Sequence, residues 1–188
     1  MEGVVLTAPD SEKFELRSLR PMKFRSLALG SLTAALYAVL TVLLAPLSYG
    51  PVQFRFSEAL TLLPYFLPEA IPGLAVGCLV ANLFGGYGAI DMLVGSGATL
   101  LAGVLTRRMP RLWMAALPPV LVNMLLIGGM LHILVGTPLA ATCLYVGLGE
   151  AGACFLIGLP LMRSLERRGL LRRDAQAEGV PRASSKSF

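Results

Sequence analysis

Long apolar runs alternate with short polar segments along this chain. Residues 26–54, 70–90 and 112–149 contain no Asp, Glu, Lys or Arg. A helix that crosses the hydrocarbon core of a membrane needs about 20 such residues. The third run is long enough for one helix and the start of another. The pattern therefore predicts an all-α integral membrane protein.

Gly and Pro residues divide the apolar runs into six predicted transmembrane helices. The first helix ends near Pro46, Gly85-Gly86 separates the third helix from the fourth, and Pro118-Pro119 must bend or restart the fifth. The second helix is short for a full span. The predicted helices cover about residues 26–47, 54–67, 71–84, 89–106, 112–130 and 138–162.

The positions of the basic residues orient these helices. All Lys and Arg residues except Arg55 fall in three clusters, at residues 13–25, 107–111 and 163–186. Short cytoplasmic loops of membrane proteins carry an excess of Lys and Arg. We therefore expect both termini and the loop between the fourth and fifth helices to be cytoplasmic. Arg55 then lies on the outer side, with Glu58 one helical turn away.

Composition agrees with this class of protein. Hydrophobic residues make up 55% of the chain and charged residues 14%, and the mean hydropathy is +0.71. The net charge of +5 is compatible with nucleic-acid binding, but the basic residues flank apolar runs, which favours a topological role. The C-terminal arginines would also lie against anionic lipid headgroups.

The chain divides into three predicted parts. Residues 1–23 form a charged cytoplasmic leader that we expect to be poorly ordered, residues 24–168 the membrane domain, and residues 169–188 a basic, polar cytoplasmic tail. The first apolar run is longer than the core of a cleavable signal peptide, so we expect it to remain as a helix. Met22 is a second candidate start of the protein.

Several motifs are missing from the sequence. The three cysteines have no Cys-x-x-Cys spacing and lie in apolar segments, and His132 stands alone in a predicted outer loop, so we expect no metal site. The only lysines, Lys13, Lys23 and Lys186, belong to no P-loop, and no hydrolase motif is present. We predict that the chain is not an enzyme and binds no cofactor.

Small residues recur at helical spacing on two of the predicted helices. They are Gly30, Ala34 and Ala38 on the first helix and Gly95, Thr99 and Gly103 on the fourth. Such faces let helices approach closely in lipid. For the fourth helix we favour packing inside the bundle. The face of the first helix is equally suited to docking another membrane subunit.

Few polar groups lie at membrane depth, and each is a candidate for function because such groups are costly in lipid. They are Arg55, Glu58, Asn82, Asp91, Asn123 and Glu150. Arg55 with Glu58 would alternatively form an internal salt bridge, and Asp91 an N-cap of the fourth helix. Glu150 has no cationic neighbour on its own helix, so it either faces a polar cavity or is neutral.

The segment from Leu44 to Pro64, LAPLSYGPVQFRFSEALTLLP, resembles the QueT family. Further motifs follow in the same order: IPGLAVGCLVANLFGGYGAIDMLVGSGATLLAG, LPPVLVNMLLIGG, LYVGLGEA and GLPLMRSLE. The resemblance covers about residues 24–168. Members of this family are the substrate-binding S components of energy-coupling factor (ECF) transporters for queuosine precursors.

The resemblance implies a six-helix subunit of the bacterial plasma membrane that captures its substrate outside the cell. It also implies docking on a module of one membrane scaffold and two ATPases, so ATP would be hydrolysed by partner subunits. The face with Gly30, Ala34 and Ala38 looks like the surface that meets the scaffold.

Queuosine precursors are 7-deazaguanine bases, and the candidate residues suit their chemistry. A carboxylate of Glu58 or Glu150 can accept two adjacent donors of a guanine-type edge. Asp91 would hold a cationic aminomethyl substituent, and Arg55, Asn82 or Asn123 would donate to the ring carbonyl. Aromatic residues near the outer mouth are expected to stack on the base; these are Tyr49, Phe54 and Tyr87.

Three other functions remain open at this point. The chain would be an S component for a different vitamin or nucleobase, a structural subunit of a larger membrane complex, or an intramembrane enzyme. The last has the weakest basis, because the sequence offers no nucleophile with a base.

Overall fold

The computed structural model describes residues 10–49 and 54–173, with side chains from Phe24 onward, and every regular element in this part of the chain is helical. The prediction of an all-α fold is therefore confirmed. The elements are α1 (Asp10–Leu43), α2 (Ala45–Ser48), η1 (Phe56–Tyr65), α3 (Ala70–Asn82), α4 (Gly88–Arg108), η2 (Met114–Ala116), α5 (Leu117–Val135), α6 (Leu139–Ala151), η3 (Gly152–Gly158) and α7 (Leu159–Arg167). The elements η1 and η2 are 3-10 helices, and η3 is a π-helix.

Four helical segments are long and apolar enough to cross a membrane. They are Phe24–Leu43, Gly88–Arg108, Met114–Val135 and Leu139–Arg167, which match the predicted first, fourth, fifth and sixth helices. The 13-residue α3 and the 10-residue η1 each extend about 20 Å, less than the hydrocarbon core of about 30 Å. The six-span topology with cytoplasmic termini stays a prediction.

The second predicted helix is the element that differs most from expectation. Residues 54–67 were expected to form one transmembrane helix, but a 3-10 helix occupies Phe56–Tyr65 and contains Pro64. Eight of its ten residues are buried, because α1, α3, α4, η3 and α7 all contact it. Its polar side chains therefore meet other helices instead of lipid, and η1 forms the centre of the bundle.

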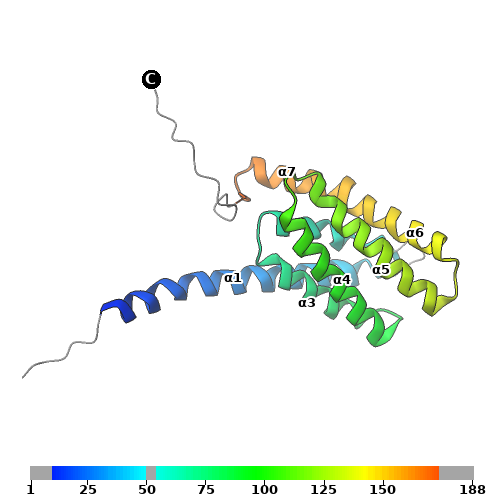
Figure 1. Cartoon of the computed structure of the whole chain (residues 1–188), viewed down its shortest axis with the longest axis horizontal. Helices are drawn as coiled ribbons and strands as arrows, with labels where there is room; N and C mark the ends of the chain where they lie inside the picture. Colours follow the sequence, from blue (N-terminus) through cyan, green and yellow to red (C-terminus); the bar gives the residue numbers. More distant parts are fainter. Residues whose placement is uncertain (1–9, 50–53, 174–188) are drawn as a thin grey trace, which may run out of the picture.

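The longer helices pack against one another in a regular order (Figure 1). Contacts join α1 to α3, α3 to α4, α4 to α5 and α5 to α6, so neighbours in the chain are also neighbours in space. The closest approach is between α1 and α3. A Cβ atom added to Gly77 would lie 2.7 Å from the carbonyl oxygen of Ala34, and one added to Gly73 would collide with the backbone of Gly30. Gly30 and Ala34 thus pack against α3.

The predicted helix breaks are confirmed with one refinement. The fifth helix restarts at Leu117 after the short η2, and its prolines stand at the first helical positions, where a missing N–H is tolerated. Gly136, with φ of 73°, ends α5 in the left-handed conformation that favours glycine. The sixth predicted helix is continuous over 29 residues but includes the π-helix η3.

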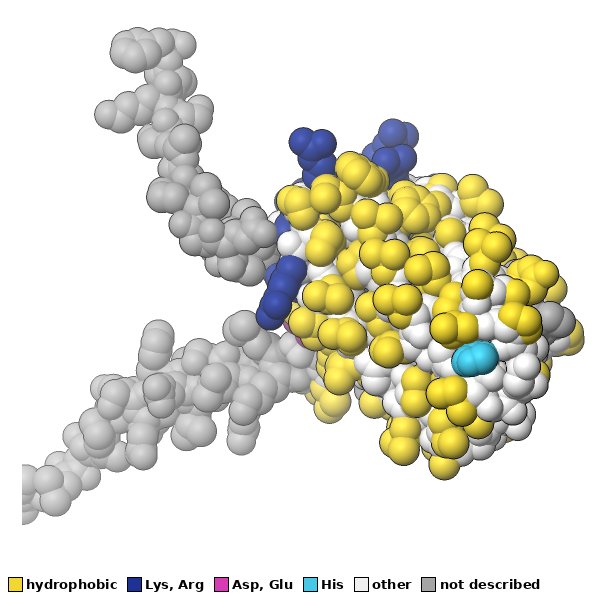
Figure 2. Space-filling view, turned by 45° about the vertical axis from the view of Figure 1, so that its right-hand side comes forward, with side chains coloured by type: hydrophobic (Ala, Val, Ile, Leu, Met, Phe, Trp, Pro, Cys, Tyr) yellow, Lys and Arg dark blue, Asp and Glu magenta, His cyan; other side chains and the backbone are white. Residues whose placement is uncertain are grey.

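The surface is that of a lipid-exposed protein. Many large apolar side chains are exposed along α1, α4, α5 and α6, including Leu32, Leu93, Leu125 and Leu144. Figure 2 shows hydrophobic side chains over most of the visible face, with Lys and Arg along its upper and left margins. On this face, the described Lys and Arg side chains thus lie at the margins of the apolar surface.

Residues 1–9 of the predicted leader and most of the predicted tail lie outside the described residues. Helix α1 begins at Asp10, within the predicted leader of residues 1–23. The described part of the chain ends at residue 173, within the predicted tail of residues 169–188.

Candidate functional site

Buried polar side chains from several helices meet beside η1. Among them, Glu58 is 2% exposed and Arg55 6%. The small cavity between these helices has a volume of about 10 Å³, enough for about one water molecule. The residues that line it are Arg55, Glu58, Cys78, Gly95, Thr99, Asn123, Ile127, Val146 and Glu150. Four of the nine predicted substrate-binding residues therefore share one cavity.

Glu58 is the central carboxyl group. Its Oε1 accepts a hydrogen bond from the Tyr37 hydroxyl of α1, and its Oε2 has no partner. Its backbone carbonyl accepts a bond of 2.5 Å from Thr61 Oγ1 and a longer contact of 3.6 Å from Cys154 Sγ of η3. One oxygen of Glu58 is thus fixed by the fold, and the other remains available.

Glu150 and Asn123 supply the opposite wall. Asn123 Nδ2 of α5 donates to Glu150 Oε1 at 2.7 Å, so an amide is the polar partner that the sequence did not reveal. The carboxyl of Glu150 lies next to that of Glu58. Glu150 stands in the last turn of α6, immediately before the π-helix, a feature that is frequent at functional sites.

Small residues let the π-helix approach η1 closely. A Cβ on Gly158 would lie 3.1 Å from the carbonyl oxygen of Ala59, and one on Gly152 would lie 2.6 Å from the ring of Phe54. The close contact between η1 and η3 holds Glu58 and Glu150 in adjacent positions.

Arg55 precedes η1 at its N-cap position and lines the same cavity. Its Nε donates to the Ser48 carbonyl oxygen at 3.3 Å, its guanidinium lies 5.6 Å from the Tyr49 ring centroid, and its Nη2 has no partner. Arg55 is close enough to Glu58 and Asp91 for Coulomb attraction. The described residues show no hydrogen bond between Arg55 and Glu58, so the predicted alternative of an internal salt bridge has no direct contact to support it.

Asp91 and Asn82 form the outer part of the cluster. Asn82 Nδ2 donates to the backbone carbonyl of Asp91 at 2.9 Å, while both carboxyl oxygens of Asp91, which is 1% exposed, lack a partner. The alternative that Asp91 is an N-cap is wrong, because α4 begins at Gly88 with Tyr87 as its N-cap. Gly95 is needed here, since a Cβ would collide with the Asn82 amide.

We call Arg55, Glu58, Asn82, Asp91, Asn123 and Glu150 the central polar cluster. Within the part of the chain that the structure describes, six buried side-chain atoms in and beside it have no hydrogen-bond partner: Ser48 Oγ, Arg55 Nη2, Glu58 Oε2, Asn82 Oδ1 and both carboxyl oxygens of Asp91. Each such group costs about 1–3 kcal/mol when it stays unsatisfied. Concentrated in one region, they indicate a site for a polar ligand that both donates and accepts hydrogen bonds.

The structure places the three predicted aromatic residues outside the cavity lining, and their stacking on a ligand stays a prediction. The Tyr49 hydroxyl donates to the Ala81 carbonyl oxygen at 2.6 Å, Phe54 packs edge-on against Phe56 with 5.1 Å between ring centroids, and Tyr87 packs against an apolar cluster of α4, α5 and α6. None of the three predicted rings lines the cavity.

Among the described residues, no group of three or more His, Cys, Asp and Glu side chains is arranged to hold a metal ion.

Tyr37, which binds Glu58, and Thr99, which lines the cavity, were not among the predicted site residues. Thr33, Tyr37 and Thr41 follow one another at four-residue spacing on α1, and all three are buried. A polar stripe of this kind on an otherwise apolar helix marks the face that points into the bundle. This signal was present in the sequence and would have identified Tyr37.

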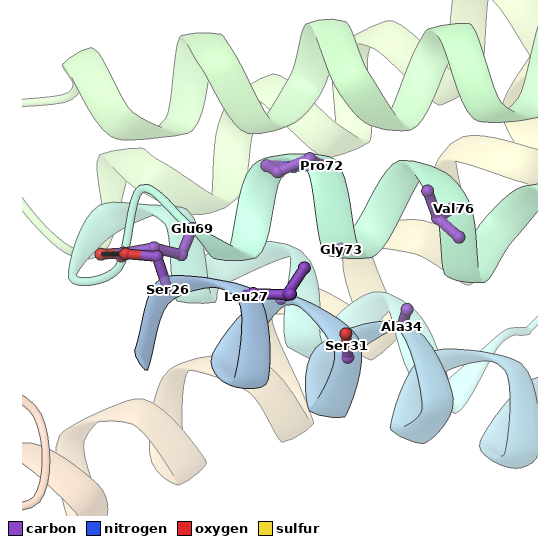
Figure 3. A pocket seen from close by; sticks show the side chains of 9 residues that line it. Ser26, Leu27, Ser31, Ala34, Glu69, Pro72, Gly73 and Val76 are labelled. Carbon is purple, nitrogen blue, oxygen red and sulfur yellow. Dashed lines mark hydrogen bonds between the residues drawn. The ribbon is translucent and has the colours of Figure 1, made fainter. Parts of the chain in front are cut away.

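A larger groove lies outside this cluster, between α1 and α3 (Figure 3). Its volume is about 520 Å³, and its lining residues are Ser26, Leu27, Gly30, Ser31, Ala34, Glu69, Pro72, Gly73 and Val76. Ser26 Oγ donates to Glu69 Oε1 at 3.2 Å at one end, but small and apolar groups form the rest. This α1–α3 groove includes two of the three predicted docking residues, while Ala38 is half-buried and lies beyond it.

Comparisons with known proteins agree with the resemblance in the sequence. A queuosine precursor transporter, QueT, of Lactococcus lactis subsp. cremoris (strain MG1363) is 38% identical over 73 residues, which cover 38% of this chain and 43% of that protein. The chain thus matches less than half of the length of this relative. No solved structure matches the chain. The sequence model of the QueT transporter family, however, matches residues 27–167, three quarters of the chain. The protein belongs to the QueT transporter family.

Proposed function

We propose that this chain is the substrate-capture subunit of an ECF-type importer and binds a 7-deazaguanine precursor of queuosine in the central polar cluster. Membership of a transporter family supports a transport role, and the related lactococcal protein is a queuosine precursor transporter. The observation that carries the proposal is the group of unpartnered polar atoms around Glu58 and Arg55.

The free atoms complement a guanine-type edge. Such an edge has two adjacent N–H donors beside one carbonyl acceptor. Glu58 Oε2 is a free acceptor for the donors, and Arg55 Nη2 is a free donor for the carbonyl. Glu150, beside Glu58, offers a second carboxyl. Hydrogen bonds to charged partners contribute about 1.5–3 kcal/mol each, which is enough to select this edge.

The charge of the cluster favours a ligand with a cationic substituent. Three carboxyl groups, from Glu58, Asp91 and Glu150, are buried near one guanidinium. Both oxygens of Asp91 are free on the side of Arg55 and Tyr49. An ammonium group of the ligand at this position would pair with the Asp91 carboxylate.

The cavity must widen when the ligand binds. Its volume of about 10 Å³ is far below the 300 Å³ or more that is typical of a small-molecule site. We infer that the five elements that line it, η1, α3, α4, α5 and α6, move apart during capture and that the structure represents a closed form.

The proposed topology has six crossings with both termini in the cytoplasm of a bacterial cell. The clusters of basic residues support this orientation. Substrate would be captured from outside the cell and released inward. The energy would come from a partner module of one membrane scaffold and two ATPases. The α1–α3 groove, whose exposed Leu27, Ser31 and Val76 face outward, is the surface that we propose for contact with the scaffold.

Transport in proteoliposomes tests this function. We expect uptake of radiolabelled 7-aminomethyl-7-deazaguanine when the chain is reconstituted with the scaffold, both ATPases and ATP. Without ATP, or without the partner module, the vesicles should retain only bound label. Uptake that proceeds without the module would overturn the ECF partnership, and absence of both binding and uptake would overturn the substrate.

A further inference from the structure

The last helix carries an arginine-lined groove at the end of the bundle opposite to the outer loops. The groove has a volume of about 480 Å³ and is lined by Pro160, Arg163, Ser164, Arg167 and Arg168 of α7 and the residue that follows it. All five side chains are exposed. No acidic side chain lines this arginine groove.

Other arginines at this end are bound to the protein itself. Arg107 Nη1 donates to the Tyr65 carbonyl oxygen at 3.3 Å and the Phe66 carbonyl oxygen at 3.4 Å. Arg173 lies 4.5 Å from the Tyr65 ring centroid and donates to its hydroxyl at 3.1 Å. These two guanidinium groups hold the end of η1 and the loop before η2 together.

The guanidinium groups of the arginine groove have no such bonds. Across residues 24–49 and 54–173, no hydrogen bond or ion pair joins the side chain of Arg163, Arg167 or Arg168 to another residue. Arg163 and Arg167 are four residues apart on one helix, where like charges repel by a few tenths of a kcal/mol. An anion in the groove would remove this repulsion and satisfy the free donors.

The groove lies where an apolar surface gives way to a basic one. The segment Leu139–Arg167 is a candidate membrane span; Arg163 and Arg167 lie at its end, and Arg168 follows it. Pro160, Arg163 and Arg167 share one face of α7. One turn earlier, Leu156 is 76% exposed, and Leu161 at the rim is 39% exposed. A molecule bound in the groove would thus contact apolar side chains along the helix and guanidinium groups at its end.

We propose that the arginine groove binds an anionic phospholipid, with the headgroup phosphate held by Arg163, Arg167 and the Ser164 hydroxyl and the acyl chains along Leu156 and Leu161. Guanidinium groups bind phosphate oxygens in pairs and are the preferred side chain for this task. This site is separate from the central polar cluster and does not depend on the transported substrate.

Native mass spectrometry of the full chain in detergent tests the proposal. We expect one bound phosphatidylglycerol, with an apparent affinity about tenfold higher than for phosphatidylcholine. The double variant R163Q/R167Q should lose this preference. The matched control R108Q/R111Q removes two exposed arginines of the other basic loop and should keep it. Equal loss in both double variants would show a general charge effect and overturn the site.

Two further arms separate a lipid from other sources of phosphate and from misfolding. R163K/R167K keeps both charges but not the paired donors, and should bind the lipid with an affinity between those of the wild type and R163Q/R167Q. All variants should unfold at the wild-type temperature, since the replaced side chains are exposed. Displacement of the lipid by millimolar inorganic phosphate alone would assign the groove to soluble phosphate and contradict the proposal, as would unchanged lipid binding in R163Q/R167Q.

Discussion

Replacing Glu58 by Gln is expected to weaken binding of a 7-deazaguanine base by about 100-fold or more, which corresponds to about 2.8 kcal/mol. The Gln side chain keeps an oxygen that accepts the Tyr37 hydroxyl, so the contact with α1 persists. It replaces the free Oε2 by an amide that donates toward a ligand edge composed of donors. A buried, mismatched donor of this kind costs more than the loss of a neutral hydrogen bond.

Titration calorimetry of the purified protein measures this effect. Glu69→Gln is the matched control, because Glu69 carries the same carboxyl in the α1–α3 groove, bonded to Ser26 and away from the cavity. It should bind the base like the wild type. An affinity of Glu58→Gln within threefold of the wild type would mean that Glu58 is not a ligand contact.

Replacing Gly73 by Ala is expected to lower the free energy of unfolding by roughly 2–3 kcal/mol. The added Cβ would collide with the carbonyl group of Gly30 and lie 3.1 Å from its Cα. Backbone atoms cannot rotate away as a side chain does, so α1 and α3 must separate along their length. Overpacking of this kind costs about 1–3 kcal/mol, and we place this site at the upper end.

Thermal unfolding in detergent should show the change as a decrease of roughly 4–12 °C in Tm. Gly97→Ala on α4 is the control, since a Cβ at that position meets no atom within 4 Å and Ala is the better helix former. Its Tm should be at or above that of the wild type. An unchanged Tm for Gly73→Ala would show that the two helices are not in the close contact described above.

Hydrophobic runs and breakers located the helices well. The long runs predict the four candidate spans, and the Pro118-Pro119 pair predicts the restart of α5, because these features depend on local chemistry alone. The conformation of the second predicted helix was harder to predict from the sequence. Its short length already argued against a full membrane span. The 3-10 element is enclosed by contacts with six other elements, and a hydropathy pattern carries no information about such neighbours.

The central polar cluster was foreseen in part. Glu58, Asn123 and Glu150 could be predicted as site residues because polar groups are rare at membrane depth. Tertiary packing brings them together. Their pairing could not be predicted, because it depends on the contact between η1 and the π-helix. Phe54 and Tyr87 were chosen by their position near the outer ends of helices, and side-chain packing turns both toward apolar neighbours instead.

The predicted docking residues Gly30 and Ala34 also show what residue spacing alone cannot predict. The spacing of Gly30 and Ala34 correctly indicates a close helix contact, but spacing does not say which helix is the partner. In the structure the partner is α3 of the same chain. Under the proposed function, the exposed rim of the α1–α3 groove, which includes Ser31 and Val76, is the part that contacts a second subunit.

Binding of a 7-deazaguanine base by the central polar cluster can be measured by titration of the wild-type protein with 7-aminomethyl-7-deazaguanine and, separately, with adenine. Adenine has a similar size but lacks the paired donors and the carbonyl of the guanine-type edge. We expect saturable binding of the first base at one site per chain and at least 100-fold weaker binding of adenine. Equal affinity for the two bases, or no binding of the first, would contradict it.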